Sequence, residues 1–370
     1  IDAIDRYYRS SNANIHRGVY ALAQEATDLF EGARERVARF CGWEPTATIL
    51  TRNATEAINL VAYAWGRDNV GSGDEVLITE MEHHSNIVPW QLLCQEVGAT
   101  LDYIEVTDDG LLDLDSLDAG LARGPKLVAV AHVSNVLGTV NPVAEIIGRA
   151  HAAGALVLVN GAQAIPHMRV DVKELGADFY GFTGHKVYGP TGIGVLYARR
   201  ELLEEMPPFL AGGDMISSVD FQESRWNELP WKFEAGTPPI AEAVGLGAAV
   251  DFLSAIGMEA VRVHETDLVA YALRRLKEIP GLTIYGPPAP ELRGALISFA
   301  IESVHPHDVA EIIAREGVCI RAGHHCAQPL MRRLGVAATS RASFAIHNTH
   351  RDVDRLITAL GSVRAVFGLA

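Results

Sequence analysis

The sequence is poor in cysteine and in positive charge, and it has no long uninterrupted apolar run. Its 370 residues include only four cysteines, at positions 41, 94, 319 and 326, with no C-x-x-C pair, so we expect no disulfide framework. Only 31 lysines and arginines stand against 46 acidic residues, a formal net charge of −15, which argues against nucleic acid as a partner. We expect a protein of the reducing cytoplasm that acts on small molecules.

Signals for export and for membrane insertion are also missing from the sequence. The first residues, IDAIDRYYRSSNANIHRG, are acidic where a signal peptide is basic, and no apolar segment follows them. The longest weakly polar stretch, residues 241–260, contains Glu242 and Asp251 and many small residues, unlike a membrane span. The chain begins with Ile1, which leaves open whether an N-terminal piece is missing.

What the chain does contain is an alternation of short apolar runs with segments of helical periodicity. The apolar runs lie at 46–52, 74–80, 126–133, 155–160, 177–182 and 192–199. Continuous apolar runs of this kind predict a parallel sheet that is buried on both faces. The stretches between them carry apolar residues at helical spacing and end in glycine, as crossover helices do. Ligands of such a sheet bind beyond the carboxyl ends of its strands.

The length predicts two domains, since it exceeds what one hydrophobic core usually holds. We expect a large α/β domain at 1–258 and a smaller α+β domain at 259–370, where helices and strands follow in a mixed order. The polar and aromatic segment 211–237 is long for a loop, so it is expected to be functional or to hold a hairpin.

Two candidate sites follow the first predicted strands. Thr55 opens a helix after the strand at 46–52, where free backbone N–H groups suit a phosphate; alternatively, Thr55 is only an N-cap. His83 and His84 follow the strand at 74–80, where an imidazole can stack on a flat ring or move a proton. Paired histidines also suggest a metal, but no further ligand stands at zinc-type spacing, so we predict no metal site.

Lys186 is the most unusual charge in the chain. It ends the segment 183–186, TGHK, directly after the strand at 177–182. Burial at such a place lowers the pKa of an ammonium group and frees the amine for Schiff-base chemistry. A lysine in a solvated turn is the alternative. Three short polar residues follow the other strands and are unremarkable singly: Asn135, Asn160 and Gln163.

Cys326 is the candidate nucleophile of the second domain. It follows His324 and His325 at a predicted turn from strand to helix, where a thiol ionises more readily than a buried one does. The other three cysteines are expected to serve packing alone, Cys319 within a strand.

Two arginines flank the region of Cys326. They are Arg321 and Arg341, and a guanidinium is a natural bidentate partner of a substrate carboxylate. Either arginine could equally form a surface salt bridge.

Taken together, these residues resemble the pyridoxal-phosphate-dependent cysteine desulfurases, specifically the SufS-type group. The resemblance covers essentially the whole chain and is carried by two motifs, GHKVYGPTGIG at 184–194 and RAGHHCAQP at 321–329. The second motif separates this group from the NifS/IscS-type desulfurases, whose cysteine lies in a longer loop. The resemblance implies fold type I of the PLP-dependent transferases, with a mainly parallel sheet, pyridoxal 5'-phosphate as cofactor and a homodimer.

The resemblance also implies a role for each candidate residue. Lys186 would bind the cofactor covalently and move the Cα proton of L-cysteine, and His83 would stack on the pyridine ring. Cys326 would take the sulfur as a persulfide, leaving L-alanine, for a SufE- or SufU-like acceptor in iron–sulfur cluster assembly. The other contacts would be Thr55, Thr183, His185 and, from a second subunit, Thr237 at the phosphate; Gln163 at the phenolic oxygen; Asn135 and Asn160 at the ring; and Arg341, Arg321 and Asn135 at the substrate.

One position departs from that family. Asn160 stands where those enzymes carry an aspartate against the pyridine nitrogen. A carboxylate holds that nitrogen protonated, whereas an amide only hydrogen-bonds to it, so we expect cofactor binding but slower removal of the Cα proton. Three origins of Asn160 stay open: an engineered or misread residue, a genuine variant, or an Asn-Gly pair that deamidates.

Two other functions stay open. A selenocysteine lyase would share the fold and the cofactor, and a catalytically weak homologue would act as a partner in sulfur traffic. The second is motivated by Asn160, and the presence of Lys186, His83, Cys326 and Arg341 as a complete set argues against it. The resemblance does not say which acceptor takes the sulfur.

Overall fold

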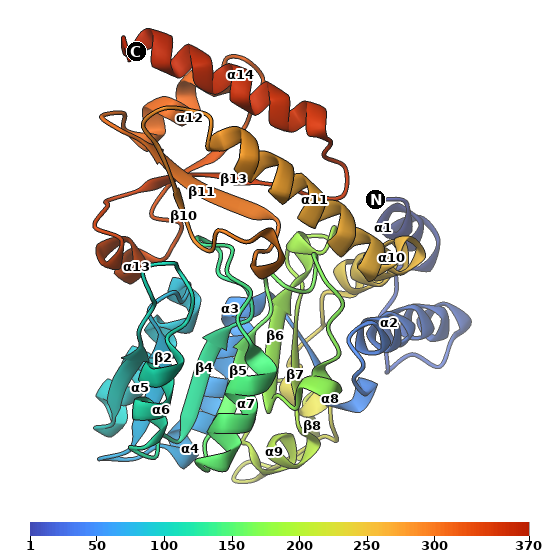
Figure 1. The fold of residues 1–370 in the computed structure, drawn as a ribbon. Coiled ribbons are helices and arrows are strands. Elements are labelled where there is room, and N and C mark those ends of the chain that lie inside the picture. The colour runs from blue at the N-terminus through green and yellow to red at the C-terminus, as the bar shows by residue number, and fades with distance from the viewer. Residues whose placement is uncertain (370) are drawn as a thin grey trace.

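A seven-stranded sheet forms the centre of the larger part of the molecule in the computed structural model, which describes residues 1–369 (Figure 1). The strand order is β1-β7-β6-β5-β4-β2-β3. The strands are β1 (Thr48–Thr51), β2 (Glu75–Thr79), β3 (Thr100–Ile104), β4 (Leu127–Ala131), β5 (Leu156–Asn160), β6 (Phe179–Thr183) and β7 (Gly194–Ala198). Only β7 runs against the others, so the prediction of a mainly parallel sheet is confirmed.

Helices cover both faces of this sheet. Alternate residues of β4 enter two different hydrophobic clusters, Val128 and Val130 on one face and Leu127 and Ala129 on the other. The first face is covered by α2 (Ala21–Phe40), α6 (Leu114–Leu121), α7 (Val143–Ala152) and α10 (Ile240–Ile256), and the second by α3 (Ala54–Leu60), α5 (Val88–Val97) and α9 (Arg200–Glu205). Three further helices are short: α1 (Asp2–Arg6), α4 (Arg67–Asn69) and α8 (Val172–Leu175). Burial on both faces explains the continuous apolar runs of the strands.

The last third of the chain forms a second, antiparallel sheet of order β10-β11-β13-β12. Its strands are β10 (Leu282–Tyr285), β11 (Leu296–Ile301), β12 (Arg321–Gly323) and β13 (Thr339–Ser343), accompanied by α11 (Met258–Leu276), α12 (Pro306–Ala314), α13 (Gln328–Arg333) and α14 (His350–Val366). A separate hydrophobic cluster, drawn from residues 268–363, lies within this part. The axes of α10 and α11 differ by 75° where the predicted boundary at residue 258 falls; the division into domains itself stays a prediction.

Two strands and one cysteine differ from the sequence-based expectation. Two strands were not predicted, because each lacks the apolar run by which the others were found. β3, at the edge of the main sheet, reads TLDYI, and β13 reads TSRAS. The strand expected to include Cys319 begins later, because only Arg321–Gly323 pairs with β13. Cys319 lies exposed before it, so its assignment to packing is wrong. The other two cysteines assigned to packing, Cys41 and Cys94, are buried as predicted.

The long segment 211–237 contains the expected hairpin, formed by β8 (Ile216–Val219) and β9 (Ser224–Trp226). Its strands are largely exposed. The end of the segment is tied to the main sheet, because Glu234 accepts hydrogen bonds from the buried Arg34 guanidinium at 2.6 and 2.8 Å and from the backbone N–H of Leu50 at 2.7 Å. A charge-paired contact of this kind fixes the segment that leads to Thr237.

Among residues 1–369, no single helix is both long and apolar enough to cross a membrane; only the bent pair α10 and α11 meets those criteria jointly.

Candidate active site

A cavity of about 280 Å³ lies at the carboxyl ends of the strands of the main sheet. It is lined by nine of the predicted site residues: Thr55, His83, Asn135, Asn160, Gln163, Thr183, His185, Lys186 and Arg321. Cys326 and Arg341 lie beside this cavity rather than in its lining, and Thr237 is exposed away from it. The edge of the sheet predicted to bind ligands is therefore where these side chains meet.

Lys186 lies at the end of a single 3-10 turn, Gly184–Lys186, that follows β6. Burial, followed by the positive charges of Arg341 and Arg321, lowers the pKa of its ammonium group to about 8. Lys186 is thus not a solvated turn residue, and its amine is available in the neutral, nucleophilic form at mildly alkaline pH.

The lowered pKa of Lys186 predicts how the rate of its covalent reaction with an aldehyde depends on pH. Since only the neutral amine reacts, the rate at which the cofactor-free protein binds pyridoxal phosphate should rise with pH and level off above about 8. A free lysine would instead keep gaining rate up to its ordinary value of about 10.4. Stopped-flow absorbance measured against pH checks this, and a rate that still climbs well above pH 9 would contradict it.

His83 is positioned by its own turn and by a buried carboxyl beneath it. Its Nδ1 accepts the backbone N–H of Ser85 at 3.1 Å and lies 2.8 Å from the Ser85 hydroxyl, which leaves Nε2 for a ligand. Burial, followed by the charge of Lys186, lowers the pKa of His83 to about 4, so the ring is neutral. Ser85 lines the cavity and was missed by the sequence analysis, because a single serine after a strand carries no distinctive signal.

Glu82 ties the ends of two strands together below His83. Its buried carboxyl accepts from the Thr79 hydroxyl, the Asn86 amide and the backbone N–H of Ala131, each at 2.7 Å. Burial raises the pKa of Glu82 to about 7. The bond from Ala131 holds the His83 segment against the end of β4, and the other two brace that segment internally.

Hydrogen-bond donors gather where α3 and the turn after β6 face the cavity. The N-cap of α3 is Asn53, whose Oδ1 accepts the N–H of Glu56 at 3.0 Å, so the alternative that Thr55 is the N-cap is wrong. Thr55 lies at the second position of the helix and lines the cavity. The Thr183 hydroxyl lies 2.8 Å from Nδ1 of His185. Hydroxyls, an imidazole and free helix N–H groups together suit a phosphate.

Asn160 ends β5 and is only 6% exposed. Its Oδ1 accepts the backbone N–H of Ala162 at 3.2 Å, which leaves the amide NH₂ as the group free to meet a ligand. The following Gly161 is required by packing, because a Cβ there would lie 2.0 Å from the ring of Tyr180. A donor at this position can bond to an unprotonated ring nitrogen but cannot stabilise a protonated one.

Cys326 lies on a strained turn between β12 and α13. His325 and Cys326 have φ of 52° and 58°, a left-handed conformation that costs non-glycine residues free energy and persists where surrounding contacts impose it. Those contacts include the Asn135 side-chain amide, which donates to the His325 carbonyl at 2.7 Å. Arg321 donates to Sγ of Cys326 at 3.7 Å, so a positive charge faces the sulfur.

Arg341 lies on β13 and connects the second sheet to the cavity. Its Nη1 donates to the backbone oxygen of Asn135 at 2.8 Å, while its Nε is buried with no hydrogen-bond partner among residues 1–369. Burial, and then the charge of Arg321, lower the pKa of Arg341 to about 10. A buried unpaired donor beside a second guanidinium calls for an anionic ligand.

Comparisons with known proteins show the family of this chain. The model of the Aminotransferase class-V family matches residues 1–356. A probable cysteine desulfurase of Halalkalibacterium halodurans is 53% identical over 369 residues, which is 100% of this chain and 90% of the relative. The apo structure of cysteine desulfurase from Thermococcus onnurineus NA1 superposes with a TM-score of 0.95 at 40% identity, covering 98% of this chain and 90% of that one. A C-DES mutant with glycine covalently linked to its PLP cofactor shares the fold, with a TM-score of 0.85 at 24% identity over 97% and 91% of the two chains.

The fold and the cavity define a pyridoxal-phosphate-dependent enzyme of fold type I. The chain belongs to the Aminotransferase class-V family and, within it, to the cysteine desulfurases. The residues present fit that cofactor: the amine of Lys186 would meet its aldehyde carbon, the donors near α3 would bind its phosphate, and the His83 imidazole would face its ring. The fit is imperfect only at Asn160, where the ring nitrogen would meet an amide.

Proposed function

We propose that this chain is an L-cysteine desulfurase of the SufS-type group. It converts L-cysteine to L-alanine and passes the sulfur, through a persulfide on Cys326, to a SufE- or SufU-like acceptor in iron–sulfur cluster assembly. The observation that carries the proposal is the short turn of Cys326, which holds a partly exposed thiol beside the cavity with the Arg321 guanidinium facing its sulfur. A thiol held in this way can reach a bound substrate and afterwards be reached by an acceptor.

Pyridoxal phosphate, when bound, supplies an electron sink for the pair left on the substrate Cα. Lys186 takes the Cα proton, because its depressed pKa leaves a base at Nζ near neutral pH. His83 remains neutral and is held by Ser85, so its Nε2 can accept or donate a proton without first losing a charge. Both groups lie on rigid ends of strands, which fixes the direction of proton transfer.

Arg341 orients the substrate through its carboxylate. Its hydrogen bond to the Asn135 backbone fixes the guanidinium plane, and the unpaired Nε and the adjacent Arg321 supply the positive field. A carboxylate bound there places the substrate between Lys186 and the Cys326 turn.

Cys326 then acts as the sulfur acceptor. Its thiolate attacks the substrate sulfur: the Sγ–S bond forms, the Cβ–S bond breaks, and Cβ keeps the electron pair and is protonated to the methyl group of alanine. The Arg321 guanidinium stabilises the attacking negative charge, because it lies 3.7 Å from Sγ.

The assembly and its location are also part of the proposal. A homodimer would bring the exposed Thr237, which follows the hairpin and the Glu234 anchor, to the phosphate site of a second subunit. A reducing cytoplasm would keep Cys326 a free thiol between turnovers.

The test of this function is the release of alanine and sulfide from L-cysteine, measured side by side for this chain and for Asn160→Asp. The substitution is expected to raise turnover about tenfold, because a hydrogen bond to a charged group is worth about 1–2 kcal/mol more than a neutral one. Cofactor content and intact mass serve as controls, so that occupancy and deamidation do not enter the ratio. Equal turnover of the two proteins would refute the role given to Asn160. If neither protein formed alanine, the alternative of a catalytically weak homologue that acts as a partner in sulfur traffic would be favoured.

A further inference from the structure

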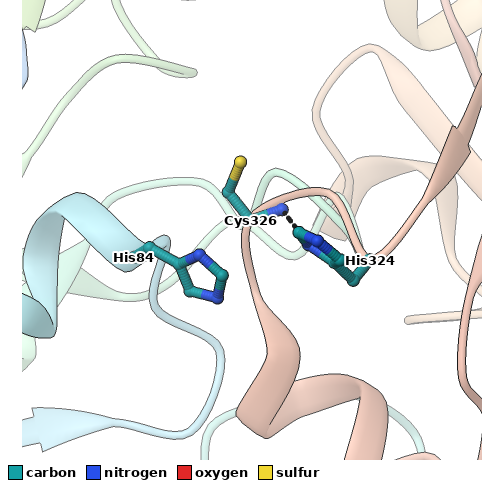
Figure 2. Close-up of side chains that lie close together, drawn as sticks. All are labelled: His84, His324 and Cys326. Carbon is teal, nitrogen blue, oxygen red and sulfur yellow. Dashed lines mark hydrogen bonds between the residues drawn. The ribbon is translucent and has the colours of Figure 1, made fainter.

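His84, His324 and Cys326 form a cluster beside the cavity (Figure 2). One nitrogen of each ring and the Cys326 sulfur all lie within 4.8 Å of one another, and the two ring centroids are 5.5 Å apart. Figure 2 shows the rings on either side of the Cys326 backbone, with the sulfur projecting above them. The mechanism above uses Cys326 and gives the two histidines no task.

The three residues reach this place from distant parts of the chain. His84 begins the turn His84–Asn86 after β2, whereas the other two lie on the turn that follows β12. For this reason their spacing in the sequence does not resemble a zinc motif, although imidazole nitrogen and thiolate sulfur are both ligands that zinc takes in proteins. Zinc bond lengths of about 2.0–2.3 Å put ligand atoms about 3.5 Å apart, so small side-chain rotations would close the cluster around an ion.

Backbone hydrogen bonds already direct both rings at this turn. Nε2 of His84 accepts the N–H of Gln328 at 3.1 Å, and Nδ1 of His324 accepts the N–H of Cys326 at 3.0 Å. Both rings therefore carry a lone pair toward the turn. An ion would replace these two hydrogen bonds, each weak compared with a metal–ligand bond.

We propose that His84, His324 and Cys326 bind a borderline-soft divalent cation, with zinc as the best match, and that the bound ion reversibly stops sulfur transfer. On binding, the S–H bond of Cys326 breaks, a sulfur–metal bond forms, and the proton passes to solvent; no oxidation state changes. His324 is exposed and the other two residues are partly exposed, so the ion can enter from solvent, and its fourth position stays open. The inhibitory part of the proposal rests on the proposed function, because it assumes that Cys326 is the nucleophile.

The test is a calorimetric titration of the holoenzyme with Zn²⁺, repeated with Co²⁺ and followed by visible absorbance. We expect one ion per chain, and a loss of affinity of at least about 100-fold in His324→Ala and Cys326→Ala, since even indirect partners of a metal ligand are worth about 10–100-fold. The matched control is His347→Ala, an exposed histidine of the same part of the chain outside the cluster, which should bind as the unchanged protein does. Alanine formation should fall in step with occupancy and return on adding a chelator.

His84→Ala alone would be ambiguous, because the His84 ring also supports the turn by accepting the backbone N–H of Gln328 at Nε2, at 3.1 Å. His324→Ala and Cys326→Ala keep that contact and therefore decide the outcome. Unchanged zinc affinity in either of them would overturn the site. If the metal-free protein forms no alanine, the proposed function fails, while the calorimetry still decides whether the cluster binds the ion.

Discussion

Lys186→Ala is expected to lower alanine formation from L-cysteine by about 10⁴-fold, the upper end of what a positioned proton-transfer group contributes. In the proposed function the amine acts twice, first in holding the cofactor covalently and then in moving the Cα proton, and no other lysine lines the cavity among residues 1–369. The variant should also lose the visible absorbance band of a lysine-bound cofactor. Single-turnover kinetics with the cofactor added in excess separates the loss of proton transfer from the loss of cofactor.

The control for this result is Lys173→Ala, which removes an exposed lysine on α8 and should leave both the band and the rate unchanged. Retention of the lysine-bound band by Lys186→Ala would show that another amine holds the cofactor. A normal band with full activity would refute the assignment of Lys186 altogether.

The strands that carry the site were predictable because the sheet buries them on both faces. β6, for example, is buried throughout, so its apolar run predicts the strand. Because ligands bind beyond the carboxyl ends of such strands, the end of this run also predicts where Lys186 lies. β13 carries Arg341 but reads TSRAS, and β3 is a half-exposed edge strand. Apolar periodicity is absent from both, so the sequence showed Arg341 only as a residue near Cys326 and not as part of a sheet that faces the cavity.

Contacts between distant segments could not be predicted from the sequence. The carbonyl of His325 bonds to Asn135, and the N–H of Gln328 bonds to His84, yet each pair joins turns from different sheets. The spacing of residues in the chain does not reveal such pairs, and this is why no further metal ligand was found for His84. The same limit applies to Glu82, whose hydrogen bond from the backbone N–H of Ala131 forms only because the ends of β2 and β4 lie side by side.

Cys326→Ala is expected to lower the conversion of L-cysteine by at least about 10³-fold, as the loss of a nucleophile does in other enzymes. Binding of the cofactor and removal of the Cα proton should persist, because Lys186 and His83 line the cavity independently of the sulfur. L-selenocysteine should still be converted at an appreciable rate, since selenide is a better leaving group and can depart without a nucleophile. The ratio of the two activities therefore reports on Cys326 alone.

The chain offers a matched control in Cys319→Ala, the other accessible cysteine of the same part of the molecule. Cys319 lies before β12, outside the turn that Arg321 and Asn135 hold around Cys326, so its loss should leave both activities intact. Persulfide formed on the protein from L-cysteine, detected by alkylation and mass spectrometry, should disappear in Cys326→Ala and persist in Cys319→Ala. If Cys326→Ala kept its cysteine activity while Cys319→Ala lost it, the sulfur would travel through Cys319, and the Arg321 contact would have to be explained as structural. Equal loss of both substrates in Cys326→Ala would instead place the defect before carbon–sulfur cleavage, because only cleavage distinguishes sulfur from selenium as a leaving group.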